Sequence, residues 1–257
     1  MNHVEKIKEK WANKELCIGA CVAFTDAAVS ELYGEAGYDF VWIDLEHSAM
    51  SLENALNHVR AARGAGAAAF IRVPSNDPVL VKPILELHPA GVIVPRIGSV
   101  EDAEQAVVSC RYPPRGGRGF GPARGTRFGD IGGVEYLDAV DDQIMVIPQI
   151  EHIDAVNDIE AILDVPGIDS IVLGPGDLSA TMGLRGQGGH PDVVAAVRKV
   201  LQAAIDRGIP AGQSCGFDAE SVRPWVDMGI SWISCDGDWI SLFKEAKQVA
   251  GALKAMR

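Results

Sequence analysis

The order of apolar segments is the feature that most constrains what this chain can fold into. Eight short apolar runs, each of a length typical for a β-strand, are separated by stretches with the periodicity of amphipathic helices. Several of the runs are apolar without alternation, as is typical of parallel strands that are buried on both faces. The expected strands are 17–24, 39–45, 68–73, 91–97, 144–151, 169–174, 210–216 and 231–236.

The segments between these strands carry signals for helix starts and ends. Ser51 and Asn54 have the spacing of a capping box, and Asp77-Pro78 places a proline at a first helical position. The expected helices are 27–36, 51–64, 78–87, one that opens at Ser99, 153–164, 191–207, 218–228 and 240–255. Strands and helices that alternate eight times in 257 residues predict an α/β fold, a (β/α)8 TIM barrel forming one domain over residues 1–257. The alternative is a doubly wound open sheet, but no GxGxxG motif opens its first strand–helix turn.

Charge and composition disfavour several classes of partner. The chain has 35 acidic and 23 basic residues and a net charge of −12, which disfavours nucleic acid and an anionic membrane surface. No run of 18 apolar residues exists to span a membrane, and the N-terminal segment lacks the apolar core of a signal peptide. The five cysteines are few and odd in number, which favours reduced thiols. We therefore expect a cytoplasmic protein.

One segment interrupts the alternation of strands and helices. Residues 111–133 are rich in glycine and contain five arginines, which is unusual in an acidic chain. A loop of this length is usually functional or disordered. The segment is interpreted as a lid or an anion-recognition loop, and the alternative is a solvated segment that contacts another subunit.

The fold prediction also indicates where a site should lie. In a (β/α)8 barrel, active sites form at the carboxyl ends of the strands. Glu151 and Asp177 both follow strands, and two carboxylates at one rim are typical of a Mg²⁺ or Mn²⁺ site or of an acid–base pair. Asp177 alone could instead be a helix cap. His47 could act as a general base or be structural, and Arg72 requires an anionic partner from the protein or the substrate.

Six stretches together resemble one known family. They are FVWIDLEHS (40–48), FIRVPSND (70–77), GVIVPRIGSVEDAEQAV (91–107), RYPPRGGRGFGPAR (111–124), PQIEH (148–152) and GIDSIVLGPGDLSATMG (167–183). These stretches occur in the order found in one family, and the chain resembles that family, the HpcH/HpaI aldolases. They are metal-dependent class II pyruvate aldolases. The resemblance covers most of the predicted barrel.

The resemblance implies a role for each matching residue. Glu151 and Asp177 would bind a divalent metal, Mg²⁺, Mn²⁺ or Co²⁺, that chelates pyruvate. Arg72 would stabilise the enolate oxygen, and His47 would belong to the base system. The remaining matches are Gln149 beside pyruvate, the backbone of Gly174, Pro175, Gly176 and Asp177 around its carboxylate, and Asp44 as support for the histidine region.

One position departs from the family pattern. In well-known members an aspartate on the helix before strand four pairs with the histidine. The equivalent residue here is Glu86, one methylene longer, and His88 lies close by. The expected catalytic pair is therefore His47 with Glu86, or this chain uses a different proton path.

These observations predict an enzyme that cleaves a 4-hydroxy-2-oxo acid into pyruvate, or a close 2-oxo acid, and an aldehyde. No lysine ends an expected strand, which disfavours Schiff-base chemistry. The alternatives are a citryl- or malyl-CoA-type lyase, a 2-oxo-acid decarboxylase, and a barrel that binds a metabolite without catalysis.

The resemblance also implies a homo-oligomer, a hexamer built from dimers that exchange C-terminal helices. The tail 240–257 is amphipathic, with Ile240, Leu242, Phe243, Ala246 and Val249 along one side. Its alternative role is that of an ordinary eighth barrel helix that packs on its own sheet.

Overall fold

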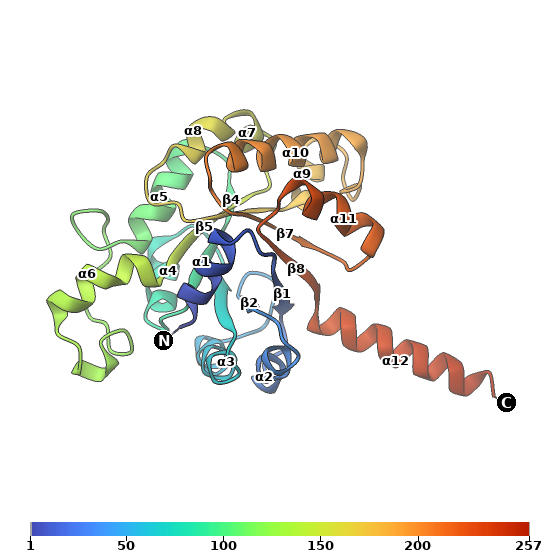
Figure 1. Ribbon diagram of the computed structural model, residues 1–257, viewed down its shortest axis with the longest axis horizontal. Coiled ribbons are helices and arrows are strands. Elements are labelled where there is room, and N and C mark those ends of the chain that lie inside the picture. The colour runs from blue at the N-terminus through green and yellow to red at the C-terminus, as the bar shows by residue number, and fades with distance from the viewer. Residues whose placement is uncertain (1, 257) are drawn as a thin grey trace.

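A closed barrel of eight parallel strands forms the centre of the computed structural model, which describes residues 2–256 (Figure 1). The strands neighbour one another in chain order, and β8 pairs with β1 to close the barrel. They are β1 (Cys17–Val22), β2 (Phe40–Asp44), β3 (Ala68–Arg72), β4 (Gly91–Ile97), β5 (Met145–Ile150), β6 (Ile171–Leu173), β7 (Ala211–Cys215) and β8 (Trp232–Gly237). The predicted (β/α)8 barrel is confirmed, and the open sheet is excluded.

Helices follow the strands at the positions that the sequence predicts, with three additions. The expected helices are α2 (Ala28–Glu35), α3 (Leu52–Gly64), α4 (Pro78–Leu85), α5 (Val100–Cys110), α7 (Ile153–Asn157) with α8 (Ile159–Leu163), α10 (Pro191–Asp206), α11 (Ala219–Met228) and α12 (Asp238–Lys254). The additions are α1 (Val4–Ala12), α6 (Gly133–Gln143) and α9 (Pro175–Thr181), and a 3-10 turn spans Arg127–Gly129. Glycine has a low helix propensity, and glycines lie at or near the start of α6 and α9. The sequence therefore did not predict these two helices.

An aromatic cluster fills the inside of the barrel. The rings of Phe40 and Phe70 stack with their centroids 4.8 Å apart, and Trp232 meets Phe40 edge-on at 5.4 Å. The Trp232 indole donates a hydrogen bond of 2.9 Å to Ser170 Oγ, which satisfies its one polar atom. Val4 and Ile7 of α1 belong to the same buried cluster and close the barrel at the amino ends of the strands. The barrel interior is therefore a packed core.

Along β2 and β3, the inward-facing residues change from apolar in the core to charged at the mouth. In a barrel strand every second residue faces inward. In β2, Phe40 and Trp42 belong to the inner cluster, and the next residue on that face is Asp44. In β3, Phe70 belongs to the cluster and is followed on the same face by Arg72. The period of the strands thus brings polar residues together at the carboxyl end.

We expect Gly212→Ala to test this packing. A Cβ at position 212 would lie 1.9 Å from the indole of Trp232, which is fully buried and cannot withdraw. Overpacking of this kind costs about 1–3 kcal/mol of unfolding free energy, and more where no neighbour can move. Urea denaturation followed by tryptophan fluorescence measures it. The matched control is Gly64→Ala, whose Cβ meets nothing within 4 Å and which should be neutral or stabilising. Equal stability of the two variants would contradict the packing argument.

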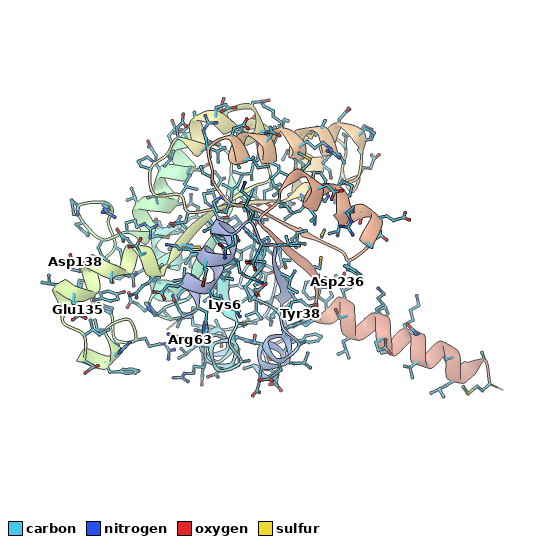
Figure 2. All side chains as sticks on the ribbon, in the orientation of Figure 1. Lys6, Tyr38, Arg63, Glu135, Asp138 and Asp236 are labelled. Carbon is cyan, nitrogen blue, oxygen red and sulfur yellow. The ribbon has the colours of Figure 1, made fainter. Side chains whose placement is uncertain are left out.

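The last helix does not pack on the barrel. α12 extends away from the rest of the molecule (Figure 1), and Figure 2 shows its side chains standing out on all sides. Asp238 is its one buried residue, and its carboxylate accepts hydrogen bonds from the N–H groups of Ala23 and Phe24. Leu242 and Phe243 are 61% and 69% exposed. The alternative of an ordinary eighth helix on its own sheet is therefore wrong. Within residues 2–256, no helix has the length and apolar character needed to cross a membrane.

The arginine-rich segment lies at the amino end of the barrel, because it connects α5 to β5 through α6. This position is opposite the carboxyl-end mouth, so the interpretation as a lid over the chain's own mouth is wrong. Two of its arginines hold the fold together. Arg111 pairs with Asp169 at 2.7 Å, and Arg118 pairs with Glu86 at 2.9 Å.

Candidate active site

Two adjoining cavities open at the carboxyl end of the barrel, and His47 lines both. One has a volume of about 600 Å³ and contains the carboxylates of Glu46, Glu151 and Asp177. The other has a volume of about 660 Å³ and contains Asp44, Arg72, Ser214, Asp236 and Trp239. Cavities of this size accept small organic ligands. The structure thus places five of the predicted site residues, Asp44, His47, Arg72, Glu151 and Asp177, at one mouth.

Arg72 is a largely buried cation held by two carboxylates. Its Nε and Nη2 atoms donate to the two oxygens of Asp44 at 3.0 and 2.6 Å, and its Nη1 lies 3.1 Å from Glu46 Oε2. Its guanidinium also lies over the ring of Trp42, 5.2 Å from the centroid. Burial lowers the pKa of Arg72, but the hydrogen bonds to Asp44 and the charges of Asp44 and Glu46 outweigh this and raise the pKa above its usual value. Arg72 is therefore a fixed positive charge in the second cavity.

Glu151 is positioned by the backbone of the neighbouring strand. Its Oε1 accepts a hydrogen bond of 2.8 Å from the N–H of Arg96, and its Oε2 accepts one of 2.6 Å from Gln149 Nε2. Arg96 has a φ of 59°, at a break in the β4–β5 register between Val94 and Ile97. Non-glycine residues with positive φ are uncommon, and they cluster at functional sites. Here the break accompanies an N–H donated to the carboxylate.

Gly174 leaves the space that this carboxylate needs. A Cβ at position 174 would lie 2.7 Å from Glu151 Oε2 and 3.2 Å from Gln149 Nε2. Both contacts are too close for ordinary packing, so a side chain here would displace the carboxylate. Gln149, predicted to lie beside the substrate, is thus placed directly against Glu151, and its Oε1 is buried without a hydrogen-bond partner among residues 2–256.

The carboxylates of the first cavity repel one another. Burial raises the pKa of Glu151, and the charges of Asp177 and Glu46 raise it further. Burial raises the pKa of Glu46 as well, against the opposing charge of Arg72. A divalent cation among these oxygens would relieve the repulsion, and carboxylates with an amide oxygen are the donors that Mg²⁺ and Mn²⁺ prefer.

The donor set leaves room for other ligands on such a cation. Across the described residues, no three His, Cys, Asp or Glu side chains converge as a complete metal-binding group. Glu151 and Asp177 would supply two ligands, and water and substrate oxygens would supply the rest, as is usual for Mg²⁺. The residues present therefore fit a metal that stays open to substrate.

The start of α9 lies at the same cavity. Gly174 is the residue that precedes this helix, Pro175 is its first residue, and Asp177 lies in its first turn. The alternative of Asp177 as the helix cap is therefore wrong. The N–H groups of Gly176 and Asp177 belong to the first turn, where a helix leaves its donors without intrahelical partners. Such donors suit an anionic oxygen.

The structure does not bring His47 and Glu86 together. His47 follows β2 at the mouth and is 63% exposed at its side chain, with Nε2 3.6 Å from Glu46 Oε2. Glu86 caps the carboxyl end of α4, which runs antiparallel to the strands, and it pairs with Arg118. Glu86 therefore lies at the amino end of the barrel, and the expected pair does not form within one chain. Glu46 is the carboxylate beside His47.

Two groups contribute to this site although the sequence did not assign them a role. Glu46 follows strand two directly, so its position was visible in the sequence, but its contacts with Arg72 and His47 were not. The N–H of Arg96 carried no signal, because nothing in the sequence marks the positive φ of that residue.

Comparisons with known proteins identify relatives of this chain. The profile of the family described as HpcH/HpaI aldolase/citrate lyase matches residues 18–236. A 5-keto-4-deoxy-D-glucarate aldolase from Escherichia coli O6:H1 is 32% identical over 95% of this chain and 94% of its own length. The crystal structure of an HpcH/HpaI aldolase from Desulfitobacterium hafniense DCB-2 superposes with a TM-score of 0.90 at 31% identity, covering 96% of each chain.

A third relative carries a different description. The crystal structure of the citrate synthase SbnG superposes with a TM-score of 0.86 at 26% identity, covering 97% of each chain. The family profile extends from β1 into β8 and so includes every strand of the barrel. The chain therefore belongs to the HpcH/HpaI aldolase/citrate lyase family.

Proposed function

We propose that this protein is a divalent-metal-dependent aldolase that reversibly cleaves a 4-hydroxy-2-oxo acid into pyruvate, or a close 2-oxo acid, and an aldehyde. The observation that carries the proposal is the arrangement of the mouth. Glu151 and Asp177 line one cavity, Arg72 lines the next, and His47 lines both. Membership in a family of aldolases and lyases supports an enzyme of this kind.

Glu151 and Asp177 are the residues that would hold the metal. When bound, a divalent cation polarises the 2-oxo group of the substrate and offsets negative charge on that oxygen. The identity of the metal, Mg²⁺, Mn²⁺ or Co²⁺, stays a prediction.

The remaining steps use groups of the chain itself. Cleavage breaks the bond between C3 and C4, the 4-hydroxyl loses its proton, and C4 becomes the aldehyde carbon. The electron pair of the broken bond moves into the C2 carbonyl as an enolate, and a proton added at C3 completes pyruvate. His47 is the exposed base that would take the hydroxyl proton, and Arg72 is the fixed cation that would stabilise the enolate. The N–H groups of Gly176 and Asp177 would hold the substrate carboxylate.

The mouth provides no amine for the alternative aldolase chemistry. A Schiff-base aldolase requires a lysine beside the substrate. Among the described residues, neither cavity of the mouth is lined by a lysine. A CoA-dependent lyase would need a group of basic residues near the mouth for the phosphates, but the arginine-rich segment lies at the opposite end of the barrel. Among the described residues, the arginines that line the cavities of the mouth are Arg72, which is held by two carboxylates, and Arg96. Both observations favour the metal-dependent aldolase.

The homo-oligomer also stays a prediction, and α12 supports it. This helix leaves Leu242, Phe243 and Val249 exposed along one side, which a second copy of the chain could cover. Exchange of C-terminal helices between copies would bury these side chains.

Removal of metal is the direct test of the proposed reaction. Pyruvate release from 4-hydroxy-2-oxo acids, followed with lactate dehydrogenase and NADH, should fall to background in EDTA. It should return when Mg²⁺, Mn²⁺ or Co²⁺ is added in excess. EDTA that leaves the rate unchanged would contradict the metal dependence. Failure to release pyruvate from any such acid with any of these metals would favour the CoA-lyase, decarboxylase or non-catalytic alternatives.

A further inference from the structure

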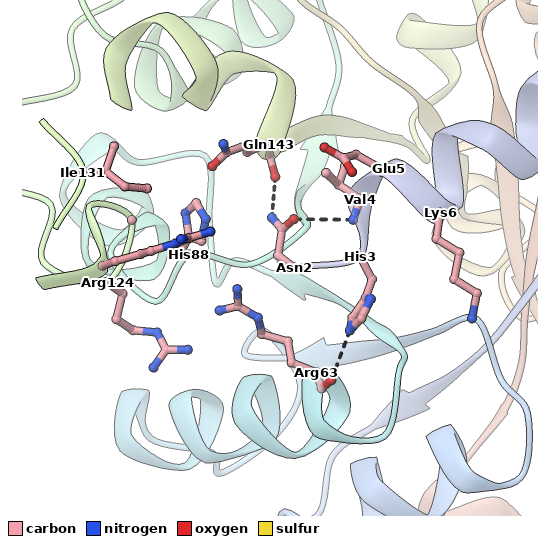
Figure 3. A pocket seen from close by; sticks show the side chains of 12 residues that line it. Asn2, His3, Val4, Glu5, Lys6, Arg63, His88, Arg124, Ile131 and Gln143 are labelled. Carbon is pink, nitrogen blue, oxygen red and sulfur yellow. Dashed lines mark hydrogen bonds between the residues drawn. The ribbon is translucent and has the colours of Figure 1, made fainter. Parts of the chain in front are cut away.

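A further, smaller cavity, drawn in Figure 3, lies at the amino end of the barrel. It has a volume of about 210 Å³ and shares no lining residue with the two cavities of the mouth. Its walls come from the start of α1, from Arg63 in the last turn of α3, from His88 after α4, and from residues 124–131 and 143. We call it the amino-end pocket.

The lining of the amino-end pocket is strongly basic. Half of its twelve lining residues are basic, and Glu5 is the one acidic residue among them. The basic residues are His3, Lys6, Arg63, His88, Arg124 and Arg127. Burial lowers the pKa of Arg63, and the charge of Arg124 lowers it further. In a chain of net charge −12, this is a local concentration of positive charge with internal repulsion.

His88 provides independent evidence that the pocket is built to receive a ligand. Its side chain lines the pocket, the residue is 7% exposed, and its Nδ1 is buried with no hydrogen-bond partner among residues 2–256. The Nε of Arg124 is buried and lacks a partner in the same way. Buried polar atoms are normally hydrogen-bonded, so two orphaned nitrogens at one pocket require an explanation.

The surroundings of His88 favour an anion as that explanation. Burial lowers the pKa of His88 to about 4, and the charges of Arg63, Arg118 and Arg124 contribute to the shift. Neutral imidazole carries one N–H, which can donate to an oxyanion. Arginine side chains offer several N–H donors in a fixed fork that fits carboxylate and phosphate oxygens.

We propose that the amino-end pocket binds a small, multiply charged oxyanion, either a phosphate group or a polycarboxylate. Lys6, Arg63, Arg124 and Arg127 supply the positive charge, and His88 and Arg124 supply the buried donors. Figure 3 shows Arg63, His88 and Arg124 around this space, with Asn2 joined to Gln143 and His3 joined to Arg63 by hydrogen bonds. A bound anion would connect the N-terminal segment, the end of α3 and the arginine-rich segment. The inference does not depend on the reaction at the mouth.

Thermal unfolding of the full chain tests this proposal. Sodium phosphate and sodium tricarballylate are titrated separately at millimolar concentration, against sodium chloride at matched ionic strength. A ligand that binds only the folded protein raises its Tm, by about 3–6 °C at ten times its Kd for a chain of this size. The anion with the larger shift identifies phosphate or polycarboxylate as the preferred chemistry.

Variants separate this pocket from other anion sites. Arg124→Gln should lose the shift, whereas the control Arg223→Gln, an exposed arginine on α11, should keep it. Lys6→Gln is a second pocket variant, on an exposed side chain, in case Arg124→Gln does not fold. The proposal is wrong if neither anion shifts the Tm of the unmodified protein beyond chloride. It is also wrong if the pocket variants respond as strongly as Arg223→Gln, because the anion then binds at the mouth or acts as a general stabilising salt.

Discussion

Glu151→Gln should abolish metal-dependent pyruvate release and, at the same time, raise the Tm of the metal-free protein near neutral pH. The loss of activity should exceed the roughly 10²–10³-fold effect of removing one hydrogen-bond donor to an oxyanion, because a metal ligand is lost. The gain in stability follows from the sign of the pKa shift. The pKa of Glu151 is raised in the folded protein, so ionising it near neutral pH opposes folding. The destabilising effect of the Glu151 charge therefore decreases as the pH falls through the raised pKa of this group.

Glutamine can be accommodated at position 151. If the side-chain amide of Gln149 rotates by half a turn, its Oε1, which lacks a partner, can accept a hydrogen bond from the N–H of the new amide. The measurement is the Tm with and without Mn²⁺, together with the rate of pyruvate release. Added Mn²⁺ should raise the Tm of the unmodified protein and leave the variant unchanged.

A carboxylate in the same cavity provides the control for this prediction. Asp154 lines the cavity of Glu151, but its side chain is 69% exposed and its ionic contact is with His152. Asp154→Asn should therefore retain both the metal response and the activity. A Glu151→Gln protein that still gains stability from Mn²⁺ would remove Glu151 from the metal site.

The second large effect is expected at Arg72. Arg72→Lys keeps one positive charge but loses the fork that binds both oxygens of Asp44 and reaches Glu46. We expect the rate of pyruvate release to fall by about 10²–10³-fold, which is typical of losing an oxyanion donor. Arg72→Ala should in addition cost about 3–5 kcal/mol of unfolding free energy, because the carboxylate of Asp44 is left buried without its partner.

Replacing Asp44 in the same background separates catalysis from stability. The double variant Asp44→Asn with Arg72→Ala removes the buried unpaired charge and should recover much of the stability lost in Arg72→Ala. It should not recover the activity, because the cation remains absent. Arg72 would have no part in the reaction if a folded Arg72→Lys protein turned over at the normal rate.

The sequence was sufficient to predict the barrel and several of the side chains that meet at its mouth. The apolar strands identified the fold, and the carboxyl-end rule then placed Asp44, Arg72, Glu151 and Asp177 at one mouth. This worked because both inferences depend on local patterns. The strand period of two is enough to continue the inner face from Phe70 to Arg72.

The relations that the sequence did not reveal are contacts between distant segments. Glu86 matches a catalytic position by its place in a motif, yet its partner is Arg118, 32 residues further along the chain. Arg111 likewise belongs to a glycine-rich stretch that predicts a loop, and its partner is Asp169, 58 residues away. Patterns of apolar and polar residues do not specify which charges meet. The positive φ of Arg96 likewise carries no sequence signal, and it lies at a break in the pairing of β4 with β5.

The aromatic core inside the barrel has an electrical consequence. Phe40, Phe70 and Trp232 form an apolar layer between the two ends of the barrel, and charges interact strongly across such a medium because few dipoles screen them. The cavity of Glu151 gathers carboxylates on one side of this layer, and the amino-end pocket gathers basic side chains on the other. These two cavities therefore differ in the sign of their lining charges, although the chain is negative overall. The field at the cavity of Glu151 would attract a divalent cation, and the field at the amino-end pocket would attract an anion, before any specific contact forms.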